Sequence, residues 1–520
     1  MRRFGSNACV AAATALLLSC APTGRAPIAK TPPPVDWAAR LAEADALYGA
    51  GHFTALREAR RIYGEALAAG REDGVAERCL RASIALALRE KQLGILPSAD
   101  PALPVAGDPA LARYASWLEI LDGLPCQIKG SSGIDQTGGR TLDAWFDWLD
   151  ARIAAIDGDL AAAAATDDLA AALRLALRQQ FAFKFKDGLE SQADLDAHPG
   201  SRLVAFQAAI APALKTQALE SILALEPGFV EVRYYLGDAA LQGGKLLTAE
   251  RHYLAVQEKI PESLSVLISL AKVAFQTEET ETCLEWNEKA LALLPTYRDA
   301  LLGKGLCLGG LGRYEEALAV LGRLLELGTY YLGEGNYWTA WNLNELGRLA
   351  EARRSIEAAG VFLVGVPEVA TLSGIIAYKQ GRLDDAERDL RRALDLDPAA
   401  SEAAYHLGKL YADRKDWLNS GIYFAGAALT YEDKERELGR KIGEIEGSEM
   451  SAERKARLVA KKRAQIGAVQ AVKATCQYNG AAGYHNAGSF ERALDLARQA
   501  AAFPAFAGKA AELIKIIQGR

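Results

Sequence analysis

The sequence predicts an all-α protein built as a solenoid of stacked antiparallel helix pairs. Three prolines, Pro227, Pro261 and Pro295, are spaced 34 residues apart, and small residues recur with nearly the same period. These small residues, at steps of 34, 34, 35, 34 and 34, are Ala249, Cys283, Ala317, Ala352, Ala386 and Ser420. A fixed period of this length indicates repeats that complete their cores by packing on their neighbours. No alternating strand pattern accompanies it.

Each element of the repeat has a physical reason. A small residue is expected where the two helices of a unit cross closely. The proline ends the second helix, because it has no N–H and clashes with the preceding turn. The dipeptides Gly312-Arg313, Gly347-Arg348 and Gly381-Arg382 are interpreted as the turn before each second helix.

These units resemble the tetratricopeptide repeat family. The family pattern of Leu, Gly, Ala, an aromatic residue and Pro is met in the first regular unit by Leu236, Gly237, Ala249, Tyr253 and Pro261. The resemblance implies a right-handed α-solenoid. Six consecutive units form a regular array at 230–434, and they are 230–263, 264–297, 298–331, 333–366, 367–400 and 401–434.

Weaker repeats are expected on both sides of the array. Residues 36–229 are interpreted as an irregular, degenerate helical region, in which Lys215 occupies the small-residue position of a unit at 196–229. Residues 474–520 are interpreted as a last unit followed by a capping helix. A glycine-rich loop at 130–139 lacks the Gly-Lys-Ser/Thr ending of a phosphate loop, so we expect a surface connection.

The first twenty residues predict export and lipidation. Arg2 and Arg3 precede an apolar run, and Leu17-Leu18-Ser19-Cys20 resembles a bacterial lipobox. The resemblance implies a signal peptide at 1–19 that is removed, and acyl chains on Cys20. The Pro-rich stretch at 20–35 is then a tether. The expected location is the outer membrane, facing the periplasm; an ordinary signal peptide is the alternative.

Composition and chemistry argue for binding rather than catalysis. The net charge of −6 over 520 residues disfavours nucleic acid as a partner. Neither metal-spaced histidine pairs nor a nucleophile motif occurs, so we expect no enzyme activity, cofactor or metal. The cysteines beyond the lipobox are expected to be buried free thiols, and they are Cys79, Cys126, Cys283, Cys307 and Cys476.

The concave groove is the expected binding site. In the family, four positions of each first helix point into it, and here many of these positions are aromatic, as suits a partner surface. Packing between units is the alternative role for each residue. Carried over, the groove residues are Tyr234, Asp238, Ile268, Lys272, Phe275, Tyr337, Trp341, Tyr378, Tyr405, Lys409, Tyr478 and His485.

Residues 435–473 interrupt the repeats. They are charged and helix-favouring, with a break near Gly447-Ser448, and Ser451 can cap the second half. We expect an antiparallel helical arm that projects from the array and packs mainly on itself. Its basic run, Arg454 to Arg463, is expected to be solvated, with an anionic lipid or a partner as the alternative contact.

The sequence therefore predicts a non-catalytic, membrane-anchored scaffold that binds a protein partner in the cell envelope. Envelope assembly, secretion and transport are the processes expected. The alternative is a small-molecule or glycan-binding lipoprotein that uses the aromatic groove as an accessory to a periplasmic solute-binding transporter component.

Overall fold

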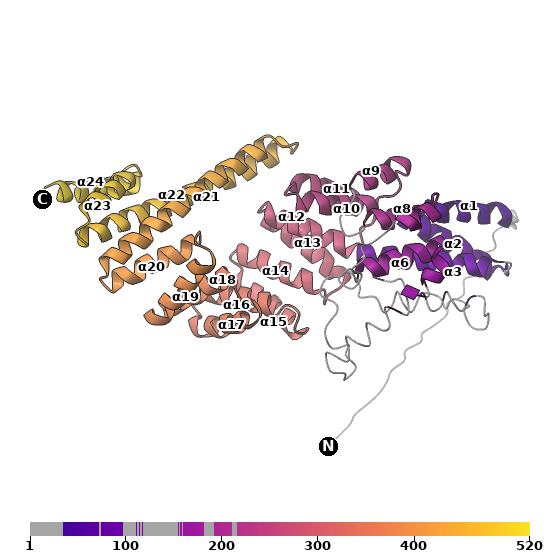
Figure 1. Cartoon of the computed structure of the whole chain (residues 1–520), viewed down its shortest axis with the longest axis horizontal. Coiled ribbons are helices and arrows are strands. Elements are labelled where there is room, and N and C mark those ends of the chain that lie inside the picture. Colours follow the sequence, from indigo (N-terminus) through magenta and orange to yellow (C-terminus); the bar gives the residue numbers. More distant parts are fainter. Residues whose placement is uncertain are drawn as a thin grey trace, which may run out of the picture.

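The computed structural model describes residues 35–71, 74–96, 160–180, 192–210 and 216–519, with single positions 111, 114, 117, 154, 157 and 158. Within these residues every regular element is a helix, as expected for an all-α solenoid. The helices follow one another along an elongated body (Figure 1). The predicted signal peptide, Cys20, Cys126 and the glycine-rich loop lie outside the described residues.

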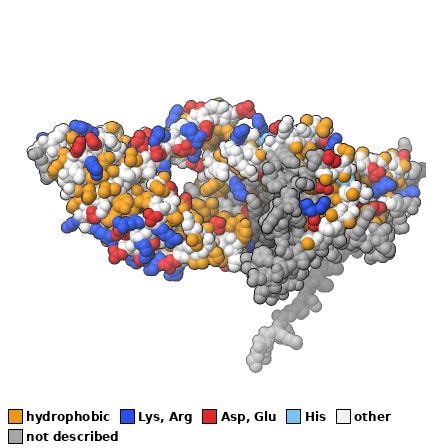
Figure 2. Space-filling model, in the orientation of Figure 1, with side chains coloured by type: hydrophobic (Ala, Val, Ile, Leu, Met, Phe, Trp, Pro, Cys, Tyr) orange, Lys and Arg blue, Asp and Glu red, His pale blue; other side chains and the backbone are white. Residues whose placement is uncertain are grey.

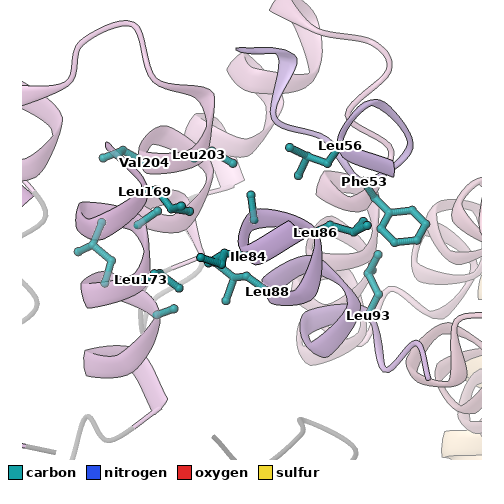
Figure 3. Close-up of a cluster of buried hydrophobic side chains, with 14 of the residues drawn as sticks. Phe53, Leu56, Ile84, Leu86, Leu88, Leu93, Leu169, Leu173, Leu203 and Val204 are labelled. Carbon is teal, nitrogen blue, oxygen red and sulfur yellow. The ribbon is translucent and has the colours of Figure 1, made fainter. Parts of the chain in front are cut away.

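The first half of the molecule contains helices of unequal length. They are α1 (Trp37–Ala50), α2 (Phe53–Ala68), α3 (Val75–Leu93), α6 (Asp168–Gln180), α7 (Gln192–Ala197), α8 (Arg202–Ala209) and α9 (Thr216–Leu225). Leucines of α6 and α8 face α3 in the core of this region (Figure 3). The same core includes Val266 and Leu270 of the regular array, so it is continuous across the two regions.

The regular array consists of helix pairs of nearly constant length. They are α10 (Glu231–Gln242), α11 (Leu246–Lys259), α12 (Leu264–Gln276), α13 (Thr280–Leu293), α14 (Arg298–Gly310), α15 (Tyr314–Glu326), α16 (Leu332–Glu345), α17 (Leu349–Phe362), α18 (Pro367–Lys379), α19 (Leu383–Leu396) and α20 (Ser401–Asp413). The chain then continues through α21 (Trp417–Glu446), α22 (Ala452–Asn486), α23 (Phe490–Ala501) and α24 (Pro504–Gln518).

Close helix crossings explain the period. All six small residues of the series, from Ala249 to Ser420, are at most 2% exposed. The glycines of the first helices have a matching role: a Cβ atom on Gly374 would lie 2.6 Å from Leu390, and one on Gly237 would lie 2.6 Å from Tyr253. The repeat period is therefore set by how closely the two helices of each unit approach.

The arm forms as two long helices, but it does not simply project. The helices α21 and α22 pack along each other, and Ser451 caps α22 by accepting a hydrogen bond from the Arg454 N–H at 3.3 Å. The far end of the arm then lies against α11 and the turn before α13 (Figure 1). The expectation of an arm that packs mainly on itself is wrong for its tip.

Two of the cysteines expected to be free are paired. Cys283 on α13 and Cys307 on α14 form a disulfide, with Cα atoms 6.4 Å apart. The bond joins two successive units of the array. Cys79 and Cys476 are buried free thiols, as expected, because both lie in helix-packing cores.

Candidate functional site

The first helices of units 367–400 and 401–434 bring three of the predicted groove residues together. The Lys409 ammonium lies 5.1 Å from the ring centroid of Tyr378 and 5.8 Å from that of Tyr405. The Tyr378 hydroxyl donates a hydrogen bond to Asp413 at 2.6 Å. Tyr378, Tyr405 and Lys409 are all half-buried. Each of the two tyrosine rings therefore has one part packed in the protein and another part at the surface.

His406 completes this cluster and was not expected from the sequence. Its ring lies 5.9 Å from Tyr378 and 5.3 Å from Tyr405. Burial, together with the positive charges of Lys409 and Lys379, lowers the pKa of His406 to about 4. The imidazole is therefore neutral at physiological pH. The groove positions carried over from the family omit it, since it neighbours Tyr405 on the more buried side of α20.

Tyr337 and Trp341 add two further aromatic side chains, both on α16. The Trp341 ring lies 5.9 Å from Tyr314 and 5.9 Å from Trp338. It also closes on the preceding unit, because a Cβ atom on Gly309 would lie 3.2 Å from it. Trp341 thus has the packing role between units that was the alternative for this residue, and it stays half-buried.

Exposed carboxylates border Tyr337. Burial, with the charges of Glu368 and Glu402, raises the pKa of Tyr337 to about 12. Both glutamates begin first helices, α18 and α20, where a negative charge also favours the helix N-terminus. The face formed by α16, α18 and α20 therefore combines aromatic rings with exposed carboxylates. Figure 2 shows hydrophobic side chains gathered over the part of the molecule that contains these helices.

In the first two units the predicted groove residues are mostly structural. Ile268 is 5% exposed and belongs to the core, so its assignment to the groove is wrong: units packed this tightly leave that side chain no open side. Tyr234 packs between Tyr235 and Tyr253, and Asp238 accepts a hydrogen bond from the Tyr253 hydroxyl at 2.7 Å.

The remaining predicted residues are separate from the aromatic cluster. Lys272 is exposed, and Phe275 is 41% exposed near the end of α12. Tyr478 packs on the terminal helix, with its ring 5.5 Å from Phe506, and the ring of His485 lies 5.8 Å from Phe490. The structure therefore concentrates the candidate site on α16, α18 and α20, and we call this the aromatic surface, formed by Tyr337, Trp341, Tyr378, Tyr405 and Lys409.

Other chemistry is sparse in the described part of the chain. No group of three His, Cys, Asp or Glu side chains that could hold a metal ion occurs among the described residues. None of the described helices combines the length and apolar character of a membrane span. A polar cavity of about 630 Å³ lies near α1 and α6, where Arg81 forms ion pairs with Asp167 and Asp168 at 2.7 and 2.8 Å.

The described helices define a helical-repeat protein. The sequence model of the family "Tetratricopeptide repeat" matches residues 371–433, which include most of α18 and all of α19 and α20. Residues 371–433 are therefore identified as tetratricopeptide repeat sequence. The chain has no significant match among curated proteins.

Several solved structures are similar to parts of the chain. A tetratricopeptide repeat protein from Parabacteroides merdae is 16% identical over 56% of this chain and 99% of its own, with a TM-score of 0.36. PilF from Pseudomonas aeruginosa is 20% identical over 40% of this chain and 97% of its own, with a TM-score of 0.35. MamA from Desulfovibrio magneticus is 18% identical over 33% of this chain and 96% of its own, with a TM-score of 0.30.

Proposed function

We propose that this protein is a non-catalytic scaffold of the bacterial cell envelope that holds an extended segment of a protein partner on its aromatic surface. The observation that carries the proposal is the convergence of Tyr378, Tyr405 and Lys409 from two successive units. Half-buried aromatic rings held by their neighbours lose little conformational freedom when they contact a partner, so they suit interface anchors.

The charges beside the rings suggest the chemistry of the partner. Glu368 and Glu402 are exposed, and both act on the Tyr337 hydroxyl. A segment that combines apolar and basic side chains would find rings for the first and carboxylates for the second. This complementarity supports orientation and association rate more than raw affinity.

The proposed location is the periplasmic face of the outer membrane. Leu17-Leu18-Ser19-Cys20 supports lipid attachment at Cys20, since several acyl chains hold a protein durably on a membrane. The Cys283–Cys307 disulfide supports an oxidising compartment, because disulfides are rare in the cytosol. Envelope assembly, secretion and transport are the processes that such a scaffold would serve.

Site-specific photo-crosslinking in native membranes tests the partner surface. A photoreactive amino acid at Lys409 should capture a protein partner. The same group at Arg388, a 67% exposed side chain on the second helix of the neighbouring unit, should not. Equal capture from both positions contradicts the proposal. Capture from neither, with a copurifying sugar or metabolite, favours the small-molecule or glycan-binding alternative.

Cys20→Ala tests the anchor separately. The variant should lose incorporation of a fatty-acid analogue and leave the membrane fraction. If the parent protein carries no label and the variant stays on the membrane, the lipoprotein proposal is wrong, whereas the proposed partner surface is unaffected.

A further inference from the structure

The tip of the arm is bound to units that precede it by more than a hundred residues. Arg454 of α22 donates hydrogen bonds to Glu250 of α11 at 2.7 and 3.0 Å and to Glu279, at the start of α13, at 3.1 Å. Arg457 also pairs with Glu279, at 2.5 Å. The residues joined are 175 to 204 positions apart in the sequence. The basic run expected to be solvated is thus largely engaged within the molecule.

The contact is partly buried rather than a loose surface pairing. Glu279 is 7% exposed and Lys462 is 5% exposed, and Leu458 and Val459 of the tip are buried as well. Exposed ion pairs contribute little to stability, but pairs removed from water that also bury apolar surface can hold one geometry. The tip therefore has one defined position on the array.

Glu278 has a strained backbone conformation, and its contacts with the arm offset the energy of that strain. It adopts a left-handed conformation, with φ of 62°, at the turn between the two helices of its unit. The equivalent turns of most other units use glycine, and these are Gly244, Gly312, Gly347, Gly381 and Gly488. A residue with a Cβ atom is strained there by about 1–2 kcal/mol.

The side chain of Glu278 supplies a hydrogen-bond acceptor for the arm, which glycine would lack. Its carboxylate accepts hydrogen bonds from Lys462, at 2.5 Å, and from Gln465, and its carbonyl accepts one from Lys461. All three donors belong to the arm. The left-handed conformation at this turn thus coincides with a carboxylate placed under the arm.

The arm begins beside the aromatic surface and ends across the array. Tyr405 packs against Tyr431 and Cys476 at the base of the arm, and Lys434 donates a hydrogen bond to Ser401 at 2.6 Å. A cavity of about 620 Å³ lies under the arm, between Glu278, Ala399 and the facing sides of α21 and α22. The arm and the units from α12 to α20 therefore form a closed ring.

We propose that the arm is a clasp that controls access of the partner to the aromatic surface. In the closed state Arg454, Arg457 and Lys462 hold the tip on Glu250, Glu278 and Glu279. In the open state the ring is broken and an extended segment can enter from the side. The gating of the partner rests on the proposed function, whereas the clasp itself stands on the contacts above.

The distance between the tip and α11 tests the clasp without a partner. Spin labels at Glu453→Cys and Glu258→Cys, two exposed positions, are placed in the full chain with every cysteine except Cys283 and Cys307 replaced by alanine. The parent should show one short separation. Arg454→Glu, which faces Glu250 and Glu279 with a like charge, should shift it to longer, broader values. Long separations in the parent, or no shift in the variant, overturn the clasp.

A matched pair of glycine substitutions tests the arm contact with variants that are not expected to destabilise the fold. Glu278→Gly relieves strain and should still open the arm. Lys415→Gly relieves the same strain, at φ of 61°, in the turn before α21, at the opposite end of that helix from the tip, and should leave the arm closed. Equal label separations in these two variants contradict the role of Glu278, and retained helicity and melting temperature confirm that both fold.

The crosslink at Lys409 then separates the two proposals. If the clasp gates access, capture of the partner rises several-fold when Arg454→Glu opens the arm. An opened arm with unchanged capture rejects the gating. An opened arm with no capture in any variant rejects the partner surface and leaves the clasp intact.

Discussion

At the scale of single residues, Arg89 is a large side chain that is fully buried in the N-terminal core. Its guanidinium lies 4.1 Å from the ring centroid of Phe206 and donates to Gln92 at 2.8 Å. Glu231 is buried nearby, and burial raises its pKa to about 7 despite the charge of Arg89. Burial likewise lowers the pKa of Arg89 to about 10. The charge of each side chain is the main interaction that offsets the cost of burying the other.

Removing Arg89 should therefore destabilise the protein in a pH-dependent way. Because the folded-state pKa of Glu231 lies above its ordinary value of 4.5, stability falls as pH rises between these values. Arg89→Met should cost about 3–5 kcal/mol at a pH well above the pKa of Glu231. The loss should be smaller below that pKa, where Glu231 is protonated. Urea unfolding at both pH values measures this, and adding Glu231→Gln should restore most of the loss.

Ala317 represents the small residues that set the repeat. It is fully buried between α14 and α15, so Ala317→Leu should overpack the crossing and cost about 1–3 kcal/mol. Ala319→Leu, an exposed position on the same helix, is the matched control and should change the melting temperature little. Equal effects from both variants would show that helix propensity, not the crossing, limits the substitution.

At the scale of elements, the docking of the arm should depend on pH. Burial alone would raise the pKa values of Glu278 and Glu279, but hydrogen bonds and charge from the arm outweigh it and lower both below 4.5. Their contribution is complete above 4.5 and is lost as pH falls through the lower folded-state values. The groups that face them are Glu250, Thr277, Arg454, Arg457, Lys461, Lys462 and Gln465.

The label separation between arm and α11 should therefore stay short at neutral pH and lengthen below about pH 4.5. Circular dichroism at each pH is the control, because helical content should persist while the arm opens. An arm that opens when pH rises instead, with the helices intact, would contradict this assignment of the carboxylates.

The disulfide between α13 and α14 should stabilise two neighbouring units. Its half-cystines are 24 residues apart, and closing a loop of this size contributes about 3 kcal/mol. Replacing Cys283 and Cys307 by alanine should lower stability by about that amount, and alanine should be tolerated at position 283, since it fills the equivalent position in other units. Unfolding with and without reductant, on parent and variant, measures it. A parent that does not respond to reductant would contradict the bond.

At the scale of the whole molecule, the clasp turns an open solenoid into a ring. Units of a solenoid normally interact only with their neighbours, so their unfolding need not be cooperative. The contacts of α22 with α11 and α13 add a link across the intervening units, which should hold the early and late units in one cooperative body.

Deleting residues 435–473 and joining their ends by a short loop tests that link. Each unit should remain helical, but the deletion exposes Glu279 and removes the buried tip. Denaturant unfolding should become broader and begin at lower urea than in the parent. A single transition as sharp as that of the parent would show that the arm adds no coupling and is dispensable for the fold.

The sequence by itself determined the repeats, because each unit is specified by neighbours in the chain. Small residues such as Ala317 and Ala386 recur wherever two local helices cross, and Gly447-Ser448 breaks one long helical stretch into the two limbs of the arm. The aromatic positions on α16, α18 and α20 follow from the same register. These features depend on contacts within about forty residues.

Only the tertiary structure decided what the repeats do together. The curvature of the array brings α22 onto Glu250, Glu278 and Glu279, and no local pattern encodes that approach. It also decided that Ile268 is core while Tyr378 keeps an open side. The physical reason is the same in each case: burial and charge pairing depend on which distant surfaces meet, and the sum of many small rotations between units fixes that meeting.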